Sequence, residues 1–167
     1  MKRILLLLLL LLLLGGACLS AQVTVVFLRH AERTSKYSNA ELTKAGRNRA
    51  QRLVAVLDGY RPAALFASDM VRTQRTLEPL ARQLGLPLQI YERGRERVLG
   101  RVLLERFQGQ TVVVCGHSDT LMNLVAALGY GESFPEIGDF DRYWVLRVPA
   151  VGSEVSLEER RQGAIPR

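Results

Sequence analysis

The chain contains two histidines, and each directly follows a run of β-branched and apolar residues. His30 ends the stretch VTVVFLRH, and His117 ends the stretch TVVVCGH. Apolar runs of this length predict buried strands of a parallel sheet. In open parallel sheets, ligands bind just beyond the carboxyl ends of the strands. If the two strands are neighbours, the imidazoles face each other across one site, with Arg29 immediately before His30.

Three kinds of chemistry fit a pair of histidines at strand ends. The first is a metal site, but two histidines leave a coordination shell short, and Arg29 would repel a cation. In the second, each histidine is simply hydrogen-bonded at its own strand end. The third is an anion pocket, in which a neutral imidazole attacks phosphorus while a protonated imidazole and an arginine hold phosphate oxygens.

A third segment, ASDMVRTQRT, favours the anion pocket. Ser68 ends another apolar run, and Arg72 follows in the first turn of an expected helix. The free N–H groups at a helix N-terminus attract anions. We therefore predict that Arg72 joins the site, whereas Arg75 and Arg82, farther along the same helix, face solvent.

From residue 22 onward, short apolar runs alternate with stretches of helical periodicity. This alternation predicts an α/β fold, a three-layer sandwich with a mostly parallel central sheet and helices on both faces. The last strand alternates in polarity and is expected at an edge. The expected strands are 23–28, 63–67, 85–91, 110–115 and 141–148. The expected helices are capped by Thr43, by Ser68 or Asp69, and by Ser118 or Asp119, with a fourth over 93–107 that turns Val98 inward.

The N-terminal residues 1–21 are typical of an export signal. A basic start precedes an apolar run over 4–14, which is too short for a comfortable membrane span. Cleavage after Ala21 would give a soluble periplasmic or secreted protein, and cleavage before Cys18 a lipid-anchored one. Gly15 fits a lipoprotein signal poorly, so we rank soluble export above lipidation and expect membrane contact only with a lipid on Cys18. An uncleaved anchor stays open. Residues 22–150 are expected to form one domain and 151–167 a polar C-terminal tail.

Composition restricts the partners. The formal net charge of +7 suits acidic substrates or anionic surfaces. It does not indicate nucleic acid, because aromatic residues do not alternate with basic ones and no helix is basic along one face. Once the signal is removed, Cys115 is the remaining cysteine, and its apolar strand predicts a small buried side chain rather than a disulfide or metal ligand.

The motifs FLRHAER, LTKAGRNRAQRL, ASDMVRTQRTLEPLARQLGL and VVVCGHSDT, in this order, resemble the histidine phosphatase superfamily, also called phosphoglycerate mutase-like. The resemblance covers about residues 23–129, which makes 22–150 a histidine phosphatase-like catalytic domain of a small, compact member. Ala31 stands where the family usually has glycine.

The resemblance implies a role for each matched residue. His30 would become phosphohistidine, and Arg29, Arg72 and His117 would complete the phosphate pocket. Arg33 either joins them or faces solvent. Catalysis would be in-line attack on a phosphoryl group held by fixed cations, followed by hydrolysis, and no metal or other cofactor is expected.

The proton donor is left open by the motifs. Many family members use a Glu after the third strand, which Glu92 approximates, and others use an Asp directly after the second histidine. Here Asp119 comes two residues after His117, where it would also serve as a helix cap, and Glu32 lies close in sequence. A leaving group of low pKa would reduce the need for any acid.

The chain is short and has no visible cap domain over the pocket. An open pocket suits a phosphorylated protein side chain or small phosphomonoesters, so we predict an exported, metal-independent phosphoric monoester hydrolase. Two alternatives remain: a non-catalytic phosphate-ligand binding protein on the same fold, and an envelope lipoprotein that binds a partner.

Overall fold

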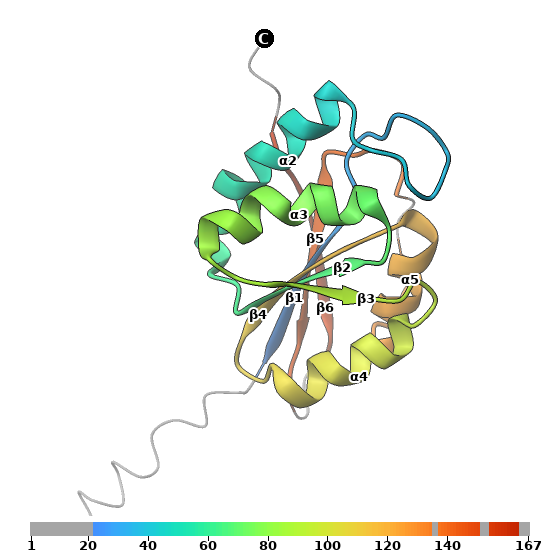
Figure 1. Ribbon diagram of the computed structural model, residues 1–167. Coiled ribbons are helices and arrows are strands. Elements are labelled where there is room, and N and C mark those ends of the chain that lie inside the picture. Colours follow the sequence, from blue (N-terminus) through green and yellow to red (C-terminus); the bar gives the residue numbers. More distant parts are fainter. Residues whose placement is uncertain (1–21, 135–136, 151–153, 164–167) are drawn as a thin grey trace, which may run out of the picture.

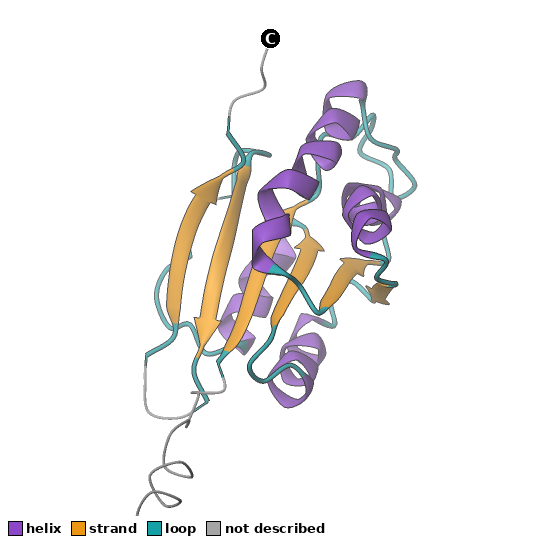
Figure 2. Ribbon diagram, turned by 90° about the vertical axis from the view of Figure 1, so that its left-hand side faces the viewer, coloured by secondary structure: helices purple, strands orange, loops and turns teal. Residues whose placement is uncertain are grey.

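The computed structural model describes residues 22–134, 137–150 and 154–163. In chain order, the elements in these ranges are β1 (Val23–Arg29), α2 (Lys44–Leu57), η1 (Asp58–Tyr60), β2 (Ala64–Ser68), α3 (Val71–Leu84), β3 (Leu88–Tyr91), α4 (Glu96–Arg106), β4 (Thr111–Gly116), α5 (Ser118–Ala127), β5 (Arg142–Val148) and β6 (Ser156–Arg161). The strands form one sheet in the order β3-β2-β4-β1-β5-β6 (Figure 1). The first four are parallel, and β5 is antiparallel to both neighbours (Figure 2).

Helices cover both faces of the sheet, which confirms the predicted three-layer α/β sandwich. Helices α2 and α3 pack on one face against Val26, Leu28 and their neighbours. Helices α4 and α5 pack on the other face against Val25 and Phe27 (Figure 1). Successive residues of a strand point to opposite faces, so a strand between two helical layers is apolar at every position. This explains the continuous apolar runs in β1 and β4.

The pairing of β1 with β4 brings the two histidine segments together. The strands are parallel and in register from Thr24 opposite Thr111 to Arg29 opposite Gly116. His30 and His117 are therefore the next residues beyond two adjacent strand ends. The backbone N–H of His30 donates to the Gly116 carbonyl at 3.0 Å, which continues the ladder by one hydrogen bond. The expectation that these strands are neighbours is confirmed.

The segment after β1 is fixed by the beginning of α2. Thr43 caps this helix as predicted, because its Oγ1 accepts from the Gly46 N–H at 3.0 Å. The Thr43 backbone N–H donates to the Glu32 carbonyl at 2.9 Å. A Cβ on Gly46 would lie 2.2 Å from that carbonyl oxygen, so the close approach requires glycine. The chain two residues beyond His30 is thereby tied to α2.

Two predicted helix caps were wrong. Met70 is the N-cap of α3, without a side-chain cap, because Ser68 is fully buried at the end of β2 and its hydroxyl bonds elsewhere. His117 occupies the N-cap position of α5, and its N–H donates to Oγ1 of Thr120 at 3.2 Å. Each helix therefore begins at a residue displaced from the expected capping side chains.

The far side of the sheet also differs from expectation. Strand β5 is interior, between β1 and β6, and residues 156–161 form the edge strand β6 although they were assigned to a polar tail. An edge strand exposes much of its surface, so its charged sequence fits this place. Val98 is 40% exposed, and Leu99 and Leu103 face the core instead.

The predicted signal, residues 1–21, lies outside the described residues. Among the described helices, none has the length and apolar character needed to span a membrane.

We predict that Gly46→Ala destabilises the chain by about 1–3 kcal/mol, because the added methyl group collides with the rigid Glu32 carbonyl. Gly59→Ala is the matched control, since a Cβ there meets nothing within 4 Å. Urea denaturation of the two variants and the parent measures the difference. Equal free energies of unfolding for both variants would contradict the packing of Glu32 on α2.

Candidate active site

A pocket of about 330 Å³ lies beyond the carboxyl ends of β1 and β4. It is lined by Arg29, His30, Arg33, Lys36, Arg72, Arg93, His117, Ser118 and Asp119. The predicted site residues meet in this pocket, with the exception of Glu92. Among the described lining residues, five carry a positive charge and Asp119 carries a negative one, so the pocket is suited to an anion.

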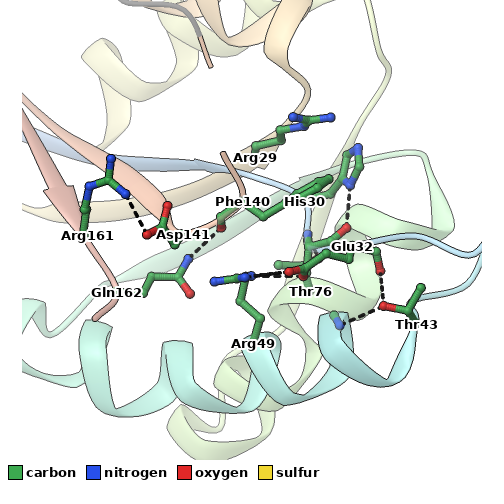
Figure 3. A network of polar contacts seen from close by, with 12 residues as sticks. Arg29, His30, Glu32, Thr43, Arg49, Thr76, Phe140, Asp141, Arg161 and Gln162 are labelled. Atoms are coloured by element: carbon green, nitrogen blue, oxygen red, sulfur yellow. Dashed lines mark hydrogen bonds and ion pairs between the residues drawn. The ribbon is translucent and has the colours of Figure 1, made fainter. Parts of the chain in front are cut away.

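His30 is held in one tautomer. Its ring is 3% exposed, and its Nδ1 lies 2.7 Å from the carbonyl oxygen of Ala31 (Figure 3). A carbonyl only accepts hydrogen bonds, so Nδ1 carries the proton and Nε2 carries the lone pair. The Ala31 N–H in turn donates to Oγ1 of Thr76 at 2.9 Å, which anchors the loop on α3. Burial lowers the pKa of His30 to about 4, because together with the charges of nearby arginines it outweighs the hydrogen bond to Ala31, which raises the pKa. The ring is therefore neutral near pH 7.

His117 faces His30, with 5.4 Å between the ring centroids. Its Nε2 lies 2.8 Å from Oγ of Ser68, and its Nδ1 lies 3.3 Å from Nη2 of Arg72. Burial, followed by the charge of Arg72, lowers the pKa of His117 to about 3. The expectation of a protonated second imidazole therefore does not hold for the chain without an anion, because Arg72 directs an N–H at the ring nitrogen.

Arg72 reaches the pocket from the first turn of α3, as predicted. It is 7% exposed, donates to the Ser38 carbonyl at 3.4 Å, and has an Nε without a hydrogen-bond partner in the described part of the chain. Burial lowers the pKa of this guanidinium, and the charge of Arg33 lowers it further. Arg75, on the same helix, instead faces solvent and pairs with Glu41 and Glu78.

Arg29 is the last residue of β1, and its side chain extends to the segment before β5. Its Nη1 donates to the Gly138 carbonyl at 3.1 Å, and its guanidinium lies 4.2 Å from the centroid of Phe140. The ring of Phe140 also packs beside His30, at 5.9 Å between centroids (Figure 3). Burial, and then Arg33, lower the pKa of Arg29. The segment before β5 thus holds Arg29 in place and packs against His30.

Arg33 lines the pocket, so of its two predicted placements the structure agrees with the one beside the other site residues. Its Nη1 donates to the Lys36 carbonyl at 3.2 Å, which brings the loop after β1 against the site. Lys36 and Arg93 were not predicted. Arg93 follows β3 at the same edge of the sheet as Arg72, so the strand-end rule could have identified it. Lys36 lies in an irregular loop, where no sequence period indicates its direction.

The candidate proton donors are placed very differently. Partial burial alone would raise the pKa of Asp119, but its hydrogen bond and ion pair with Arg93 outweigh this and lower the pKa. Glu92 lies outside the pocket, with an exposed side chain paired to Arg95 at 3.4 Å. Glu32 turns away to Arg49, which binds it at 2.6 Å (Figure 3). Of these three carboxyl groups, Asp119 is the one that lines the pocket, and it is paired with Arg93.

Two hydroxyl residues that sequence reasoning did not assign to the site support His117. Ser68 was expected to cap a helix, and Thr73 was not singled out. Oγ of Ser68 lies 2.9 Å from Oγ1 of Thr73, which in turn donates to the Met70 carbonyl at 2.7 Å.

Among the described residues, no group of three or more histidine, cysteine or acidic side chains is arranged to hold a metal ion.

Comparison with known proteins agrees with this geometry. Residues 25–103 match the model of the histidine phosphatase superfamily, branch 1. An 8-oxo-(d)GTP phosphatase of Mycolicibacterium smegmatis is 42% identical over 67 residues, which cover 36% of this chain and 21% of that protein. The chain therefore spans about a fifth of the length of this relative.

Similar solved structures share the fold at low sequence identity. The protein histidine phosphatase SixA, in complex with tungstate, superposes with a TM-score of 0.70 and 19% identity over 83% of this chain and 97% of that one. The mycobacterial glucosyl-3-phosphoglycerate phosphatase Rv2419c gives a TM-score of 0.66 and 18% identity over 75% and 90% of the two chains. These likenesses show a shared fold, and the family match over residues 25–103 identifies the chain as a member of the histidine phosphatase superfamily.

Proposed function

We propose that this chain is an exported phosphatase that transfers the phosphoryl group of its substrate to His30 and then to water. The observation that carries the proposal is the tautomer of His30, whose Nε2 lone pair is available in a pocket lined by arginines. A neutral imidazole among fixed cations is a competent nucleophile toward a phosphoryl group. The names of the relatives support the enzyme class, phosphoric monoester hydrolase.

In the proposed reaction, Nε2 of His30 attacks phosphorus in line with the leaving group. The N–P bond forms as the bond from phosphorus to the leaving group breaks, and the electron pair departs with the leaving group. Arg29, Arg72 and Arg33 hold the phosphoryl oxygens as charge shifts among them. Water then attacks the phosphohistidine, which releases phosphate and restores His30. The protein supplies position and fixed charge, and no step calls for a cofactor.

The substrate class follows from the proton donors. Among the described residues of the pocket, Asp119 is ionised by Arg93, and no carboxyl is held neutral to protonate a departing oxygen. The proposed substrates therefore carry leaving groups of low pKa, such as a phosphorylated imidazole or an aryl or acyl phosphate. A phosphorylated protein side chain fits this class, and SixA, a protein histidine phosphatase by name, supports it.

We also propose that the chain works in the periplasm or outside the cell. The support is the sequence of residues 1–21, with its basic start, apolar run and small residues before Ala21. Soluble export is preferred to a lipid anchor on Cys18. Detection of the mature N-terminus in a periplasmic or culture fraction tests this part of the proposal independently of activity.

We predict that His30→Ala abolishes turnover of p-nitrophenyl phosphate in EDTA and also abolishes covalent labelling. The parent, quenched in base during turnover, should carry phosphate on His30, because phosphohistidine is stable in base and labile in acid. Mass spectrometry of the labelled peptide locates the group. Equal turnover by parent and variant, or no turnover by the parent on several phosphoesters, would favour the non-catalytic binding protein instead.

We predict that Arg72→Ala lowers kcat/KM about 10²–10³-fold, because it removes a buried donor from the developing charge on the phosphoryl oxygens. Arg75→Ala, which removes an exposed arginine from the same helix, should change kcat/KM less than about threefold. Steady-state kinetics on p-nitrophenyl phosphate measures both. Similar losses in the two variants would place Arg72 outside the phosphate pocket.

We predict that p-nitrophenyl phosphate is hydrolysed at least about a hundredfold faster, in kcat/KM, than an alkyl phosphate, since general acid catalysis would otherwise supply about that factor. Asp119→Asn and Glu92→Gln should leave the ratio between the two substrates unchanged. Kinetics of the three proteins on both substrates tests this. A variant that loses more activity on the alkyl phosphate than on the aryl phosphate would identify the missing acid.

A further inference from the structure

His117 is hydrogen-bonded to Arg72 through one ring nitrogen and to a chain of two hydroxyl groups through the other. Its Nδ1 lies 3.3 Å from Nη2 of Arg72, on the pocket side. Its Nε2 lies 2.8 Å from Oγ of Ser68, a residue that is completely buried. Oγ of Ser68 lies 2.9 Å from Oγ1 of Thr73, and Oγ1 of Thr73 lies 2.7 Å from the Met70 carbonyl oxygen. The ring therefore has one nitrogen toward the pocket and one toward the protein interior.

The direction of each hydrogen bond in this chain is fixed by chemistry. A guanidinium has donors only, so Nδ1 of His117 must accept from Arg72. The ring proton then lies on Nε2 and is donated to Ser68. The Thr73 hydroxyl donates to the carbonyl of Met70 at 2.7 Å or of Ser68 at 3.0 Å, both of which can only accept, so the Ser68 hydroxyl donates to Thr73. His117 is thus neutral in the free chain, with its lone pair facing the pocket.

A bound phosphoryl dianion makes this arrangement unfavourable. A lone pair on Nδ1 would face an anionic oxygen, whereas an N–H there would form a charge-assisted hydrogen bond. Nε2 cannot supply this donor, because it faces the buried Ser68 and not the pocket. Arg72, whose Nη2 now satisfies Nδ1, is the residue the anion would attract. Anion entry therefore frees Nδ1 and at the same time gives it a reason to hold a proton.

We propose that His117 takes up one proton from solvent at Nδ1 when a tetrahedral dianion enters the pocket, and that Ser68 is the positioning residue that reserves this nitrogen. The inference rests on the proposed function, because it assumes that the pocket binds the phosphoryl group. The balance is one added proton: Nδ1 gains an N–H, Nε2 keeps its own, and the N–H of Arg72 turns from Nδ1 to an anion oxygen.

The charges around His117 explain why the proton arrives with the anion. Four ionisable groups act on it from the packed elements: His30 after β1, Arg72 on α3, Arg93 after β3 and Asp119 on α5. Burial and three of these groups disfavour an imidazolium, and the Asp119 carboxylate, shared with Arg93, is the one that favours it. A bound dianion adds the missing negative charge, so the pKa of His117 rises from about 3 in the free chain.

The sign of the pH dependence follows. The complex binds one proton more than the free chain, so anion affinity is highest at low pH and falls as pH rises. The fall is about tenfold per pH unit between the free and the bound pKa of His117. His30 differs, because its proton is already on Nδ1 and is donated to Ala31, so Nε2 keeps its lone pair for attack. The two histidines therefore start as opposite tautomers.

The chain offers a direct test, because it has two histidines and therefore two sets of imidazole ¹⁵N signals. Nitrogen NMR of ¹⁵N-histidine-labelled protein at pH 7.5, assigned with His30→Ala, should show His30 protonated on Nδ1 and His117 on Nε2. Tungstate is a tetrahedral dianion that does not titrate near neutral pH. When it binds, both ring nitrogens of His117 should carry a proton. Tungstate affinity should fall with rising pH in parallel.

Ser68→Ala tests the positioning role. Without the hydroxyl, Nε2 loses its acceptor, so the Nδ1-protonated tautomer of His117 should become populated. This tautomer already presents an N–H to the anion, so tungstate affinity should lose the fall of about tenfold per pH unit. Ser68→Thr, which keeps the hydroxyl, should retain the parent tautomer. Amide spectra of both variants check that the fold is intact. An unchanged His117 tautomer and titration in folded Ser68→Ala would overturn the role of Ser68.

Two other outcomes would be decisive. Tungstate binding that leaves His117 neutral would overturn the proton uptake but not the phosphatase proposal, which turnover and labelling of His30 test separately. Failure of tungstate to bind at all would overturn both, because the pocket would then not be an oxyanion site. Protonation of His117 already in the free chain at pH 7.5 would also overturn the inference.

Discussion

The site depends on the register of β1 against β4. Arg29 stands opposite Gly116, so His30 and His117 leave the sheet side by side. A slip of one residue would turn each side chain of a strand to the opposite face and separate the two imidazoles. Gly116 is part of this constraint, because a Cβ there would lie 2.9 Å from Leu121 and from the Tyr91 hydroxyl. The buried apolar faces on both sides keep the register, so core packing sets the geometry of the polar site.

The second constraint is electrostatic. Arg29 and Arg72 are partly buried near other cations, which lowers their pKa values and leaves the Nε of Arg72 without a partner among the described groups. Such a cluster is unfavourable until an anion neutralises it, because buried charge without compensation destabilises a fold. Part of the anion's binding energy thus comes from relieving repulsion already present. Burial, assisted by this repulsion, keeps both imidazoles neutral in the free chain. A neutral ring suits His30 as a nucleophile, whereas His117 needs a second N–H to hold an anion oxygen.

Much of this arrangement could be predicted from the sequence, because strands and strand ends have local signatures. The apolar runs before His30 and His117, and the position of Arg72 after the run ending in Ser68, placed three segments at one edge of the sheet. The remaining features depend on tertiary contacts. Nothing local reveals that Ser68 bonds to His117 rather than to a helix, or that residues 156–161 add a strand beyond β5. The tautomer of His117 likewise depends on the directions of the hydrogen bonds around it, which are tertiary contacts.

The lining of the pocket bears on how the proposed phosphatase would select its substrates. On one side, Arg29 is held by the Gly138 carbonyl and the face of Phe140. The opposite side carries Arg93 and Asp119, whose ion pair is exposed. A site lined mainly by charged side chains and two imidazoles offers little shape complementarity to a leaving group. Under the proposed function, discrimination then rests on the charge of the phosphoryl group and the pKa of the leaving group.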